Sequence, residues 1–398
     1  PTFWNNLVNG VCGIDYIQEF PTENLPVRIA GKVKDFHPEN YGMDKGFSRK
    51  QDLFTQYGVA AAYEAMNQAG LISEGEGQNI DPFRLGVYVG SGIGGMTTFV
   101  ENCKKLFDGG PKKVSPFFIP SMIANIAAGT IAIKHNAQGP SMCVVTACAT
   151  STNNIGEALR AIRHGYADAI ITGGCENATI PLGIAGFANA KALSRAENPK
   201  YASLPFNANR AGFVMGDGAG ILVLEELEHA KARGAKIYAE IVGYGNTCDA
   251  HHATAPRPDG ITQAKCIELA LEEAGFNKDT DKLYINAHGT GTKLNDVAET
   301  KAYKIALGDY AYKAHISSIK CMTGHMFGAA GAAEAITTIL ALNNGIIPPT
   351  INLDTPDPEC DLDYTPNTAV KTDLTLGISD SLGFGGHNAC IAFRKYEE

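Results

Sequence analysis

Segments with the pattern of a buried strand alternate with segments with the pattern of an amphipathic helix along most of the chain. Residues 85–89 and 169–172 are short apolar runs rich in β-branched side chains, as in strands covered on both faces. Residues 149–163 place apolar side chains on one face of a helix that ends at Gly165. This alternation is typical of an α/β fold. Further strands are expected at residues 142–146, 220–224, 237–242, 283–286, 314–318 and 389–393, and further helices at 225–231, 261–274, 296–306 and 329–342.

The strand–helix pattern restarts near residue 235, so we expect two similar halves, residues 1–235 and 236–398. No stretch rich in proline or serine separates them, which predicts a shared interface in place of a flexible linker. Residues 144–150 and 284–290 also resemble each other. Each is expected to end a strand with small residues and then to present a reactive side chain, Cys148 in one and His288 in the other. This similarity suggests an internal duplication.

The ten cysteines indicate a reducing compartment. None belongs to a Cys-x-x-Cys pair, and several, such as Cys143 and Cys390, lie in apolar stretches. We therefore expect free thiols in the cytoplasm, with no disulfide framework and no metal site.

Charge and hydropathy disfavour two classes of partner. Lys and Arg number 33 and Asp and Glu 42, which gives a net charge of −9 and argues against binding to a nucleic-acid backbone. The longest apolar run, residues 119–133, is interrupted by Ser121, Asn125 and Thr130 and is too short to cross a bilayer. We expect neither a nucleic-acid partner nor a membrane partner.

Cys148 is the first candidate for catalysis. It stands between an expected strand and the expected helix 149–163. The helix dipole and the free N–H groups of the first turn would stabilise a thiolate there and lower the pKa of the thiol. A buried structural cysteine is the alternative interpretation, and the partners expected near Cys148 decide between the two.

Two histidines and a lysine complete a nucleophilic site. His288 follows an expected strand and precedes alternating Gly and Thr residues, whose backbone and hydroxyls suit contact with a ligand. Lys320 and His325 lie in a turn-like segment, where a single cation is costly to bury unless it is paired or functional. A cysteine protease or a thiolase-like enzyme would suit these residues. The protease would need an Asn or Asp beside one histidine, and neither a second histidine nor a lysine.

Four motifs resemble the signatures of the β-ketoacyl-acyl-carrier-protein synthases. They are Thr-Ala-Cys-Ala-Thr-Ser at 146–151, Asn-Ala-His-Gly-Thr-Gly-Thr at 286–292, Lys320 with Thr-Gly-His at 323–325, and Gly-Phe-Gly-Gly at 383–386. The resemblance covers essentially the whole chain, and it is greatest to the elongating type II enzymes of fatty-acid synthesis. It implies the thiolase fold, in which two similar α/β halves form five layers (α-β-α-β-α), and it implies a homodimer.

The resemblance also implies a reaction without a metal or an organic cofactor. Cys148 would accept an acyl group from a thioester, and malonyl-acyl-carrier protein would then lose its carboxylate and condense with that group. His288 and His325 would donate Nε2–H to the enolate oxygen. Lys320 would orient and tune the histidines. The remaining catalytic roles would fall to the N–H groups of Cys148 and Phe384, which form an oxyanion hole, and to Glu334, which partners Lys320.

Substrate and partner residues follow from the same resemblance. Thr290 and Thr292 would bind the pantetheine arm. Ile93 would form the floor of an acyl pocket that Phe118 and Ile123 also line. The acidic acyl carrier protein would dock on exposed basic residues, namely Arg49, Lys50, Lys112, Lys113 and Lys191.

The chain departs from the family pattern in two places. The family opens with a strand that carries a Thr-Gly-x-Gly turn, whereas residues 1–4 have the pattern of a helix, so the first sheet is expected to have room for one further strand. His387 and Leu382 stand where the family usually has Thr and Phe, which alters the loop around Phe384.

Four alternative functions share parts of these patterns. A biosynthetic thiolase would use a second cysteine as base, and only Cys390 is available near the C-terminus. A polyketide ketosynthase would use the same chemistry, whereas a non-catalytic chain-length subunit would lack the nucleophile. The glycine-rich residues 90–95 match a dinucleotide-binding fingerprint, but no second strand with an acidic end follows. Close packing of these glycines against an acyl chain or a second subunit is the preferred interpretation.

Overall fold

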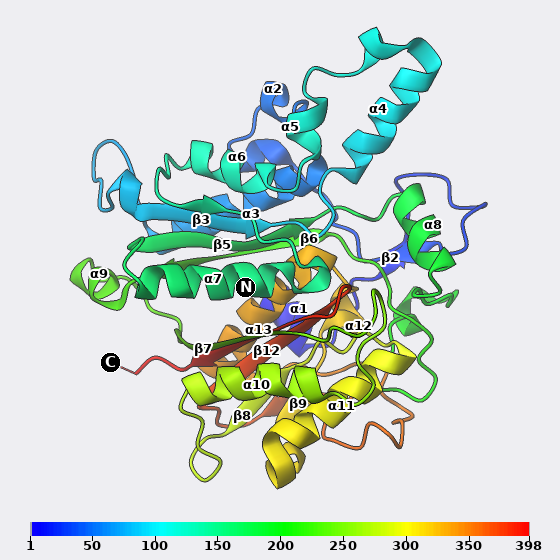
Figure 1. Cartoon of the computed structure of the whole chain (residues 1–398), viewed down its shortest axis with the longest axis vertical. Helices are drawn as coiled ribbons and strands as arrows, with labels where there is room; N and C mark the ends of the chain where they lie inside the picture. Colours follow the sequence, from blue (N-terminus) through cyan, green and yellow to red (C-terminus); the bar gives the residue numbers. More distant parts are fainter. Residues whose placement is uncertain (1, 398) are drawn as a thin grey trace.

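The computed structural model describes residues 2–397, which form five layers (Figure 1). Helices α7 (Thr150–Arg163) and α13 (Ala330–Asn344) lie between two sheets. Helices α3 (Leu53–Ala69) and α6 (Ile126–Lys134) cover the outer face of the first sheet, and α10 (Ile261–Glu273) and α11 (Lys293–Leu307) cover that of the second. The predicted α/β fold with two similar halves in five layers is confirmed.

The first sheet has the strand order β4-β3-β5-β6 and the second the order β7-β13-β12-β8-β9. The strands of the first sheet are β3 (Leu85–Gly90), β4 (Ser141–Met142), β5 (Ala169–Glu176) and β6 (Gly218–Glu225), and those of the second are β7 (Glu240–Cys248), β8 (Leu283–Asn286), β9 (His315–Ser317), β12 (Leu376–Gly383) and β13 (His387–Arg394). The other helices are α1 (Thr2–Val8), α2 (Lys45–Ser48), α4 (Met96–Gly109), α5 (Phe118–Met122), α8 (Pro181–Asn189), α9 (Leu227–Ala232) and α12 (Lys320–Thr323). Two small two-stranded sheets pair β1 (Asp15–Tyr16) with β2 (Ile29–Ala30) and β10 (Ile346–Ile347) with β11 (Val370–Lys371).

The two sheets are built on one plan. In each, three strands run parallel and a fourth is antiparallel, so β4, β3, β5 and β6 correspond to β9, β8, β12 and β13. The turn before α7, which carries Cys148, therefore corresponds to the segment before α13. His288 follows β8 and corresponds to Ser91, which follows β3. The sequence similarity between residues 144–150 and 284–290 therefore does not mark the structural repeat, and that part of the duplication argument was wrong.

Two expected strands differ from the structure. Of the expected strand 142–146, only Met142 pairs with β3, together with the preceding Ser141, because side chains of α7 take over the hydrogen bonds of the following residues. The Val144 N–H donates to Asn154 Oδ1 at 3.0 Å, and the Thr146 N–H donates to Thr150 Oγ1 at 2.9 Å. The strand expected at 237–242 is instead β7, which extends to Cys248 along β13.

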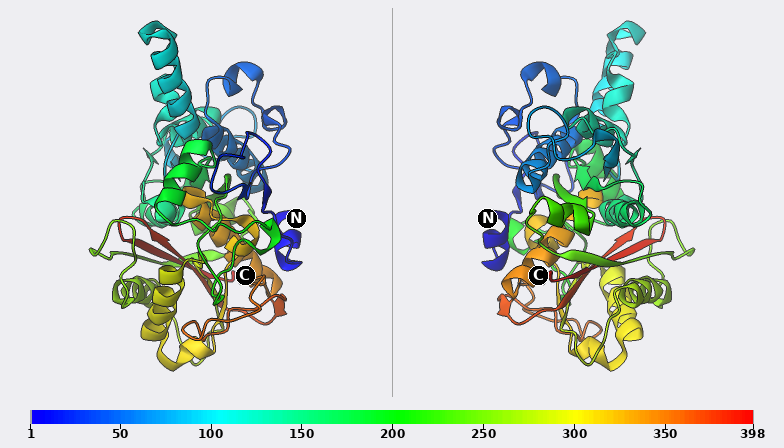
Figure 2. Two further views of the ribbon diagram at one scale, coloured as in Figure 1. Left: turned by 90° about the vertical axis from the view of Figure 1, so that its right-hand side faces the viewer. Right: turned by 90° about the vertical axis from the view of Figure 1, so that its left-hand side faces the viewer.

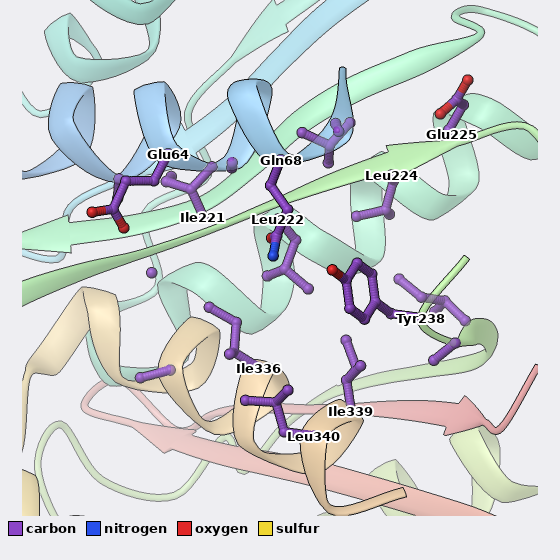
Figure 3. Close-up of a pocket in the computed structure, with 18 of the residues that line it drawn as sticks. Glu64, Gln68, Ile221, Leu222, Leu224, Glu225, Tyr238, Ile336, Ile339 and Leu340 are labelled. Atoms are coloured by element: carbon purple, nitrogen blue, oxygen red, sulfur yellow. The ribbon is translucent and has the colours of Figure 1, made fainter. Parts of the chain in front are cut away.

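One edge of the first sheet is free. Strand β7 covers the outer edge of β13, whereas no strand within residues 2–397 covers the corresponding edge of β6. A groove of about 1420 Å³ follows this edge between α3, β6 and α13, and Phe3 and Trp4 of α1 also line it. Leu222, Tyr238 and Ile336 surround the groove (Figure 3).

A strand added at this edge should stabilise the fold. We expect an extension of about eight alternating Val and Thr residues before Pro1 to pair antiparallel with β6, as β7 pairs with β13. The melting temperature should rise by about 2 °C or more, since each kcal/mol is worth ~2–4 °C in domains of 150–250 residues and less in a longer chain. The β6 amides should also exchange hydrogen more slowly. An extension with proline at alternate positions cannot complete the pairing and is the control. Equal melting temperatures for the two extensions would contradict the prediction.

Candidate active site

Cys148 lies in the sharp turn that connects β4 with α7. Residues 147–149 form a short 3-10 turn, and Ala147 has a φ of 50°, which reverses the chain just before the thiol. Cys148 is 9% exposed and packs in a cluster with Ile184 and Phe327. Burial raises the pKa of the Cys148 thiol to about 12, although the Lys320 charge and the Phe384 N–H oppose this rise. The expected lowering of this pKa was wrong, because removal from water outweighs the stabilisation by the helix N-terminus.

The Phe384 N–H reaches the thiol from the β12–β13 hairpin. The hairpin approaches Cys148 so closely that a Cβ on Gly383 would lie 2.5 Å from the Thr146 carbonyl oxygen. The His387 ring lies against Gly385 in the same loop, 3.0 Å from where a Cβ would stand. Phe384 therefore faces the nucleophile on a loop whose shape depends on glycine.

His288 and His325 come from the second half and face each other. Their ring centroids are 5.3 Å apart and the rings are nearly perpendicular. Each residue is 2% exposed. Burial, and then the nearby Lys320 charge, lower the pKa of both imidazoles well below the ordinary value. Both rings are therefore neutral in the folded protein at neutral pH.

Lys320 connects His288 with Glu334 of α13. Its Nζ forms an ion pair with Glu334 Oε1 and lies 3.4 Å from His288 Nδ1. An ammonium group can only donate hydrogen bonds, so His288 Nδ1 accepts and the proton of the neutral ring resides on Nε2. The contact thus fixes the tautomer in which His288 can donate Nε2–H.

Glu299 is a site residue that the sequence analysis did not identify. From α11, its carboxylate accepts the N–H groups of His288 at 2.7 Å and Gly289 at 2.9 Å, and so holds the loop after β8. The detectable signal was an acidic residue in the helix that follows the histidine loop. In the same loop the hydroxyls of Thr290 and Thr292 lie 3.0 Å apart.

An aromatic cluster around His325 was also missed. The rings of Phe213 and Phe327 lie 5.2 Å and 4.9 Å from the His325 ring, and Phe187 stacks on Phe327 at 4.8 Å. Three separate segments contribute these rings, so no periodic sequence pattern reveals them. The cluster gives the site an apolar wall.

The expected acyl-pocket residues fall into two places. Ile93 packs against the cluster that contains Cys148. Phe118 begins α5 and packs against Phe99 of α4 at 6.3 Å, and Ile123 ends α5. Neither of these two belongs to the Cys148 cluster of the described chain. Helix α4 projects from the body of the molecule (Figure 2).

The expected docking residues are all exposed. Lys50 lies with its Nζ 5.2 Å from the centroid of the Phe117 ring, just before α5. Lys112 and Lys113 follow α4 in the same part of the molecule, and Arg49 neighbours Lys50 in sequence. Lys191 follows α8.

Cys390 lies away from this site. It is fully buried inside β13, where it pairs with Asp380 of β12 and Gly245 of β7. Burial raises the pKa of its thiol well above the ordinary value. A thiolase mechanism with Cys390 as the second cysteine therefore does not fit the geometry.

Comparison with known proteins shows which family the chain resembles over its length. The model for the beta-ketoacyl synthase N-terminal domain matches residues 1–230, and that for the beta-ketoacyl synthase C-terminal domain matches residues 238–354. The chain is 48% identical over 396 residues to 3-oxoacyl-[acyl-carrier-protein] synthase 2 of Synechocystis sp., which covers 99% of this chain and 94% of the relative. It is 49% identical over 397 residues to the protein of the same name from Staphylococcus aureus, which covers 100% and 94%.

Solved structures show the same architecture. A complex of a type II polyketide acyl-carrier protein with its ketosynthase superposes with a TM-score of 0.90 at 35% identity, over 99% of this chain and 95% of that chain. A beta-ketoacyl synthase from Burkholderia phymatum gives a TM-score of 0.90 at 33% identity, over 99% and 94%. The identity to the two 3-oxoacyl synthases is thus higher than that to the polyketide ketosynthase.

The buried Lys320–Glu334 pair should be strongly coupled. Either Lys320→Met or Glu334→Gln leaves one buried polar partner without its counterpart, and loss of one member of a buried ion pair costs ~3–5 kcal/mol of unfolding free energy. The double variant should recover much of that loss, which urea unfolding of all four proteins measures. The exposed Lys282–Asp373 pair is the control and should show no measurable coupling. Strict additivity at Lys320 and Glu334 would contradict the prediction.

Proposed function

Since this chain belongs to the β-ketoacyl synthase family, we propose that it is an elongating 3-oxoacyl-[acyl-carrier-protein] synthase of fatty-acid synthesis. The observation that carries the proposal is that Cys148 packs in one cluster with Phe327, whose ring lies 4.9 Å from that of His325, which in turn faces His288. We assign the nucleophile to a first unit, residues 1–235, and the histidines and Lys320 to a second, residues 236–398.

In the first step, Cys148 Sγ attacks the carbonyl carbon of an acyl thioester. A new carbon–sulfur bond forms, the bond to the carrier's pantetheine sulfur breaks, and the thiol proton goes to the departing sulfur. The N–H groups of Cys148 and Phe384 stabilise the negative charge on the carbonyl oxygen. Because the resting thiol is protonated, charge develops only as the reaction proceeds.

In the second step, malonyl-carrier protein loses its carboxylate as carbon dioxide. The electron pair of the broken carbon–carbon bond forms an enolate, whose oxygen accepts Nε2–H bonds from His288 and His325. The enolate carbon then attacks the carbonyl carbon of the acyl-enzyme and the carbon–sulfur bond breaks. Cys148 leaves as the thiolate and takes up a proton from solvent, which restores the resting thiol. Neutral donors in a buried site suit this developing charge, and Lys320, paired with Glu334, keeps His288 in the required tautomer.

Substrate contacts complete the proposal. Thr290 and Thr292 bind the pantetheine arm at the loop after β8. Ile93 closes the acyl pocket beside Cys148, and Phe118 and Ile123 complete the pocket wall from α5. The preference for fatty-acid elongation rests on 48–49% identity to 3-oxoacyl synthases, against 35% to the polyketide ketosynthase. A polyketide ketosynthase is the second candidate because of the TM-score of 0.90, and it would show repeated condensation without reduction.

We also propose that two copies associate. Strand β4 is an edge strand, and Met142 and Val145 beside it are 46% and 49% exposed. An exposed edge with apolar side chains suits pairing with a second subunit. All ten cysteines are free thiols, which suits the cytoplasm. No helix within residues 2–397 is long and apolar enough to span a membrane.

Cys148 should carry the acyl group. Incubation with acyl-acyl-carrier protein should add one acyl mass to the wild-type chain and none to Cys148→Ala, which should also lose condensation. Intact-mass spectrometry with peptide mapping measures both. Cys143→Ala, five positions away and half-buried, is the matched control and should acylate normally. Acyl label that persists on Cys148→Ala, or that maps to Cys143, would refute the assignment.

The basic residues should serve carrier docking. Lys112→Glu together with Lys113→Glu should raise KM for carrier-bound substrates about tenfold or more, because the carrier is acidic and the patch steers encounter. A small pantetheine thioester should react at an unchanged rate. Lys282→Glu is the matched exposed control in the second half. Equal losses with both substrates would indicate general damage in place of lost docking.

A further inference from the structure

Glu176 is a buried carboxylate beside the active site that the mechanism does not use. It ends β5 and is fully buried. Within residues 2–397 no Lys, Arg or His forms an ion pair with it. Its partners are three neutral donors: the Ser91 hydroxyl at 2.6 Å, the Gly92 N–H at 2.8 Å and the Gly328 N–H at 3.0 Å. Desolvation raises the pKa of this carboxyl to about 7 despite these bonds.

The carboxylate joins two turns that belong to different halves. Oε2 accepts both the Gly92 N–H of the segment after β3 and the Gly328 N–H of the segment before α13. The two glycines lie face to face, since a Cβ on Gly328 would lie 2.3 Å from the Gly92 nitrogen. A Cβ on Gly92 would lie 3.1 Å from the carbonyl oxygen of Ala147, which precedes the nucleophile. Glu176 thus joins two turns of the site, and the turn before Cys148 lies against one of them.

Each of these turns carries a side chain of the reaction site. Ile93 follows Gly92 and packs against the Cys148 cluster. Phe327 precedes Gly328, has a φ of 46° and lies 4.9 Å from the His325 ring. A phenylalanine in this left-handed region is strained and persists only where the surroundings hold it. The Gly328 N–H bond to Glu176 is one such restraint.

We propose that Glu176 is a positioning residue that holds the acyl-pocket wall at Ile93 and the Phe327 ring beside His325 in one arrangement. The fit of an acyl chain against Ile93 is thereby coupled to the position of the Phe327 ring. This ring lies beside His325, which acts in the condensation step. The assignment of Ile93 to an acyl pocket rests on the proposed function. Glu176 acts through the reach of its side chain to both backbone N–H groups, and its charge is secondary.

Two conservative variants separate reach from charge. Glu176→Gln keeps the reach: its amide oxygen can accept the Gly92 and Gly328 N–H groups, and its amide nitrogen can donate to Ser91 Oγ. Glu176→Asp keeps the charge but is one methylene shorter and cannot span both turns. We therefore expect Glu176→Gln to behave like the wild type and Glu176→Asp to be impaired.

The first measurement needs no substrate. Hydrogen exchange at residues 91–95 and 326–329 should be about tenfold faster or more in Glu176→Asp, and unchanged in Glu176→Gln. Exchange within β3 and α13 should be unchanged in both, which shows that the variants are folded. Unchanged exchange at the two turns in Glu176→Asp would overturn the proposal whether or not the chain is a synthase.

The second measurement compares condensation rates with acyl-carrier proteins that carry acyl chains of increasing length. Acylation of Cys148 in the wild type is measured alongside, because it tests the proposed function separately. Glu176→Asp should lose long-chain condensation about tenfold more than short-chain condensation, mainly through KM, and Glu176→Gln should restore the wild-type profile within about twofold. An equal loss at every length, or equal impairment of both variants, would overturn the proposal, because a general structural role or a charge role would then explain Glu176.

Discussion

Helices α7 and α13 approach each other so closely that only small side chains fit between their first turns. A Cβ on Gly331 would lie 2.0 Å from Thr152 Oγ1, and the same hydroxyl lies 2.7 Å from Ser381 Oγ of β12. Each helix begins directly after a segment of the site, the Cys148 turn for α7 and the Phe327 turn for α13. The close approach therefore brings the nucleophile of one half to the histidines of the other.

The same packing buries the site, and this burial sets the charge states of the side chains in it. The thiol of Cys148 and the imidazoles of His288 and His325 are all held in their neutral forms by burial. The Lys320–Glu334 ion pair places opposite charges against each other in the site, and there each offsets the desolvation of the other. When negative charge appears on a thioester oxygen in this buried site, the hydrogen-bond donors are already in place, so little reorganisation of the protein is needed. The burial that raises the pKa of the Cys148 thiol thus also strengthens the hydrogen bonds that we propose His288 and His325 donate in the second step.

Local sequence patterns predicted the strands that are buried along their whole length. Strands β3, β5 and β8 are buried on both faces and appear as short apolar runs, which is why they were located correctly. Strand β12 was missed, because its buried polar residues obscure the pattern and find partners far away in sequence; Asp380, for example, accepts the Tyr303 hydroxyl.

The residues of the candidate site likewise divide into those that the sequence reveals and those that it does not. Side chains that act by their own chemistry, such as Cys148 and Lys320, stand out in a sequence because few alternatives explain a reactive or charged residue in an apolar context. Glu176 and Glu299 act by accepting backbone N–H groups of distant turns, and Phe327 acts by filling space. Their roles depend on which segments meet, and this is a property of the topology that no local pattern contains.

Equivalent positions in the two halves supply complementary chemistry. The segment after β4 carries Cys148, whereas the segment after the corresponding β9 carries Lys320 and His325. The segment after β3 carries Ile93, whereas the segment after the corresponding β8 carries His288. Because both pairs of segments end at the interface between the sheets, each half brings one part of the reaction to the same point. Neither half alone holds both the proposed nucleophile and the proposed donors, so the proposed reaction needs the interface between the halves.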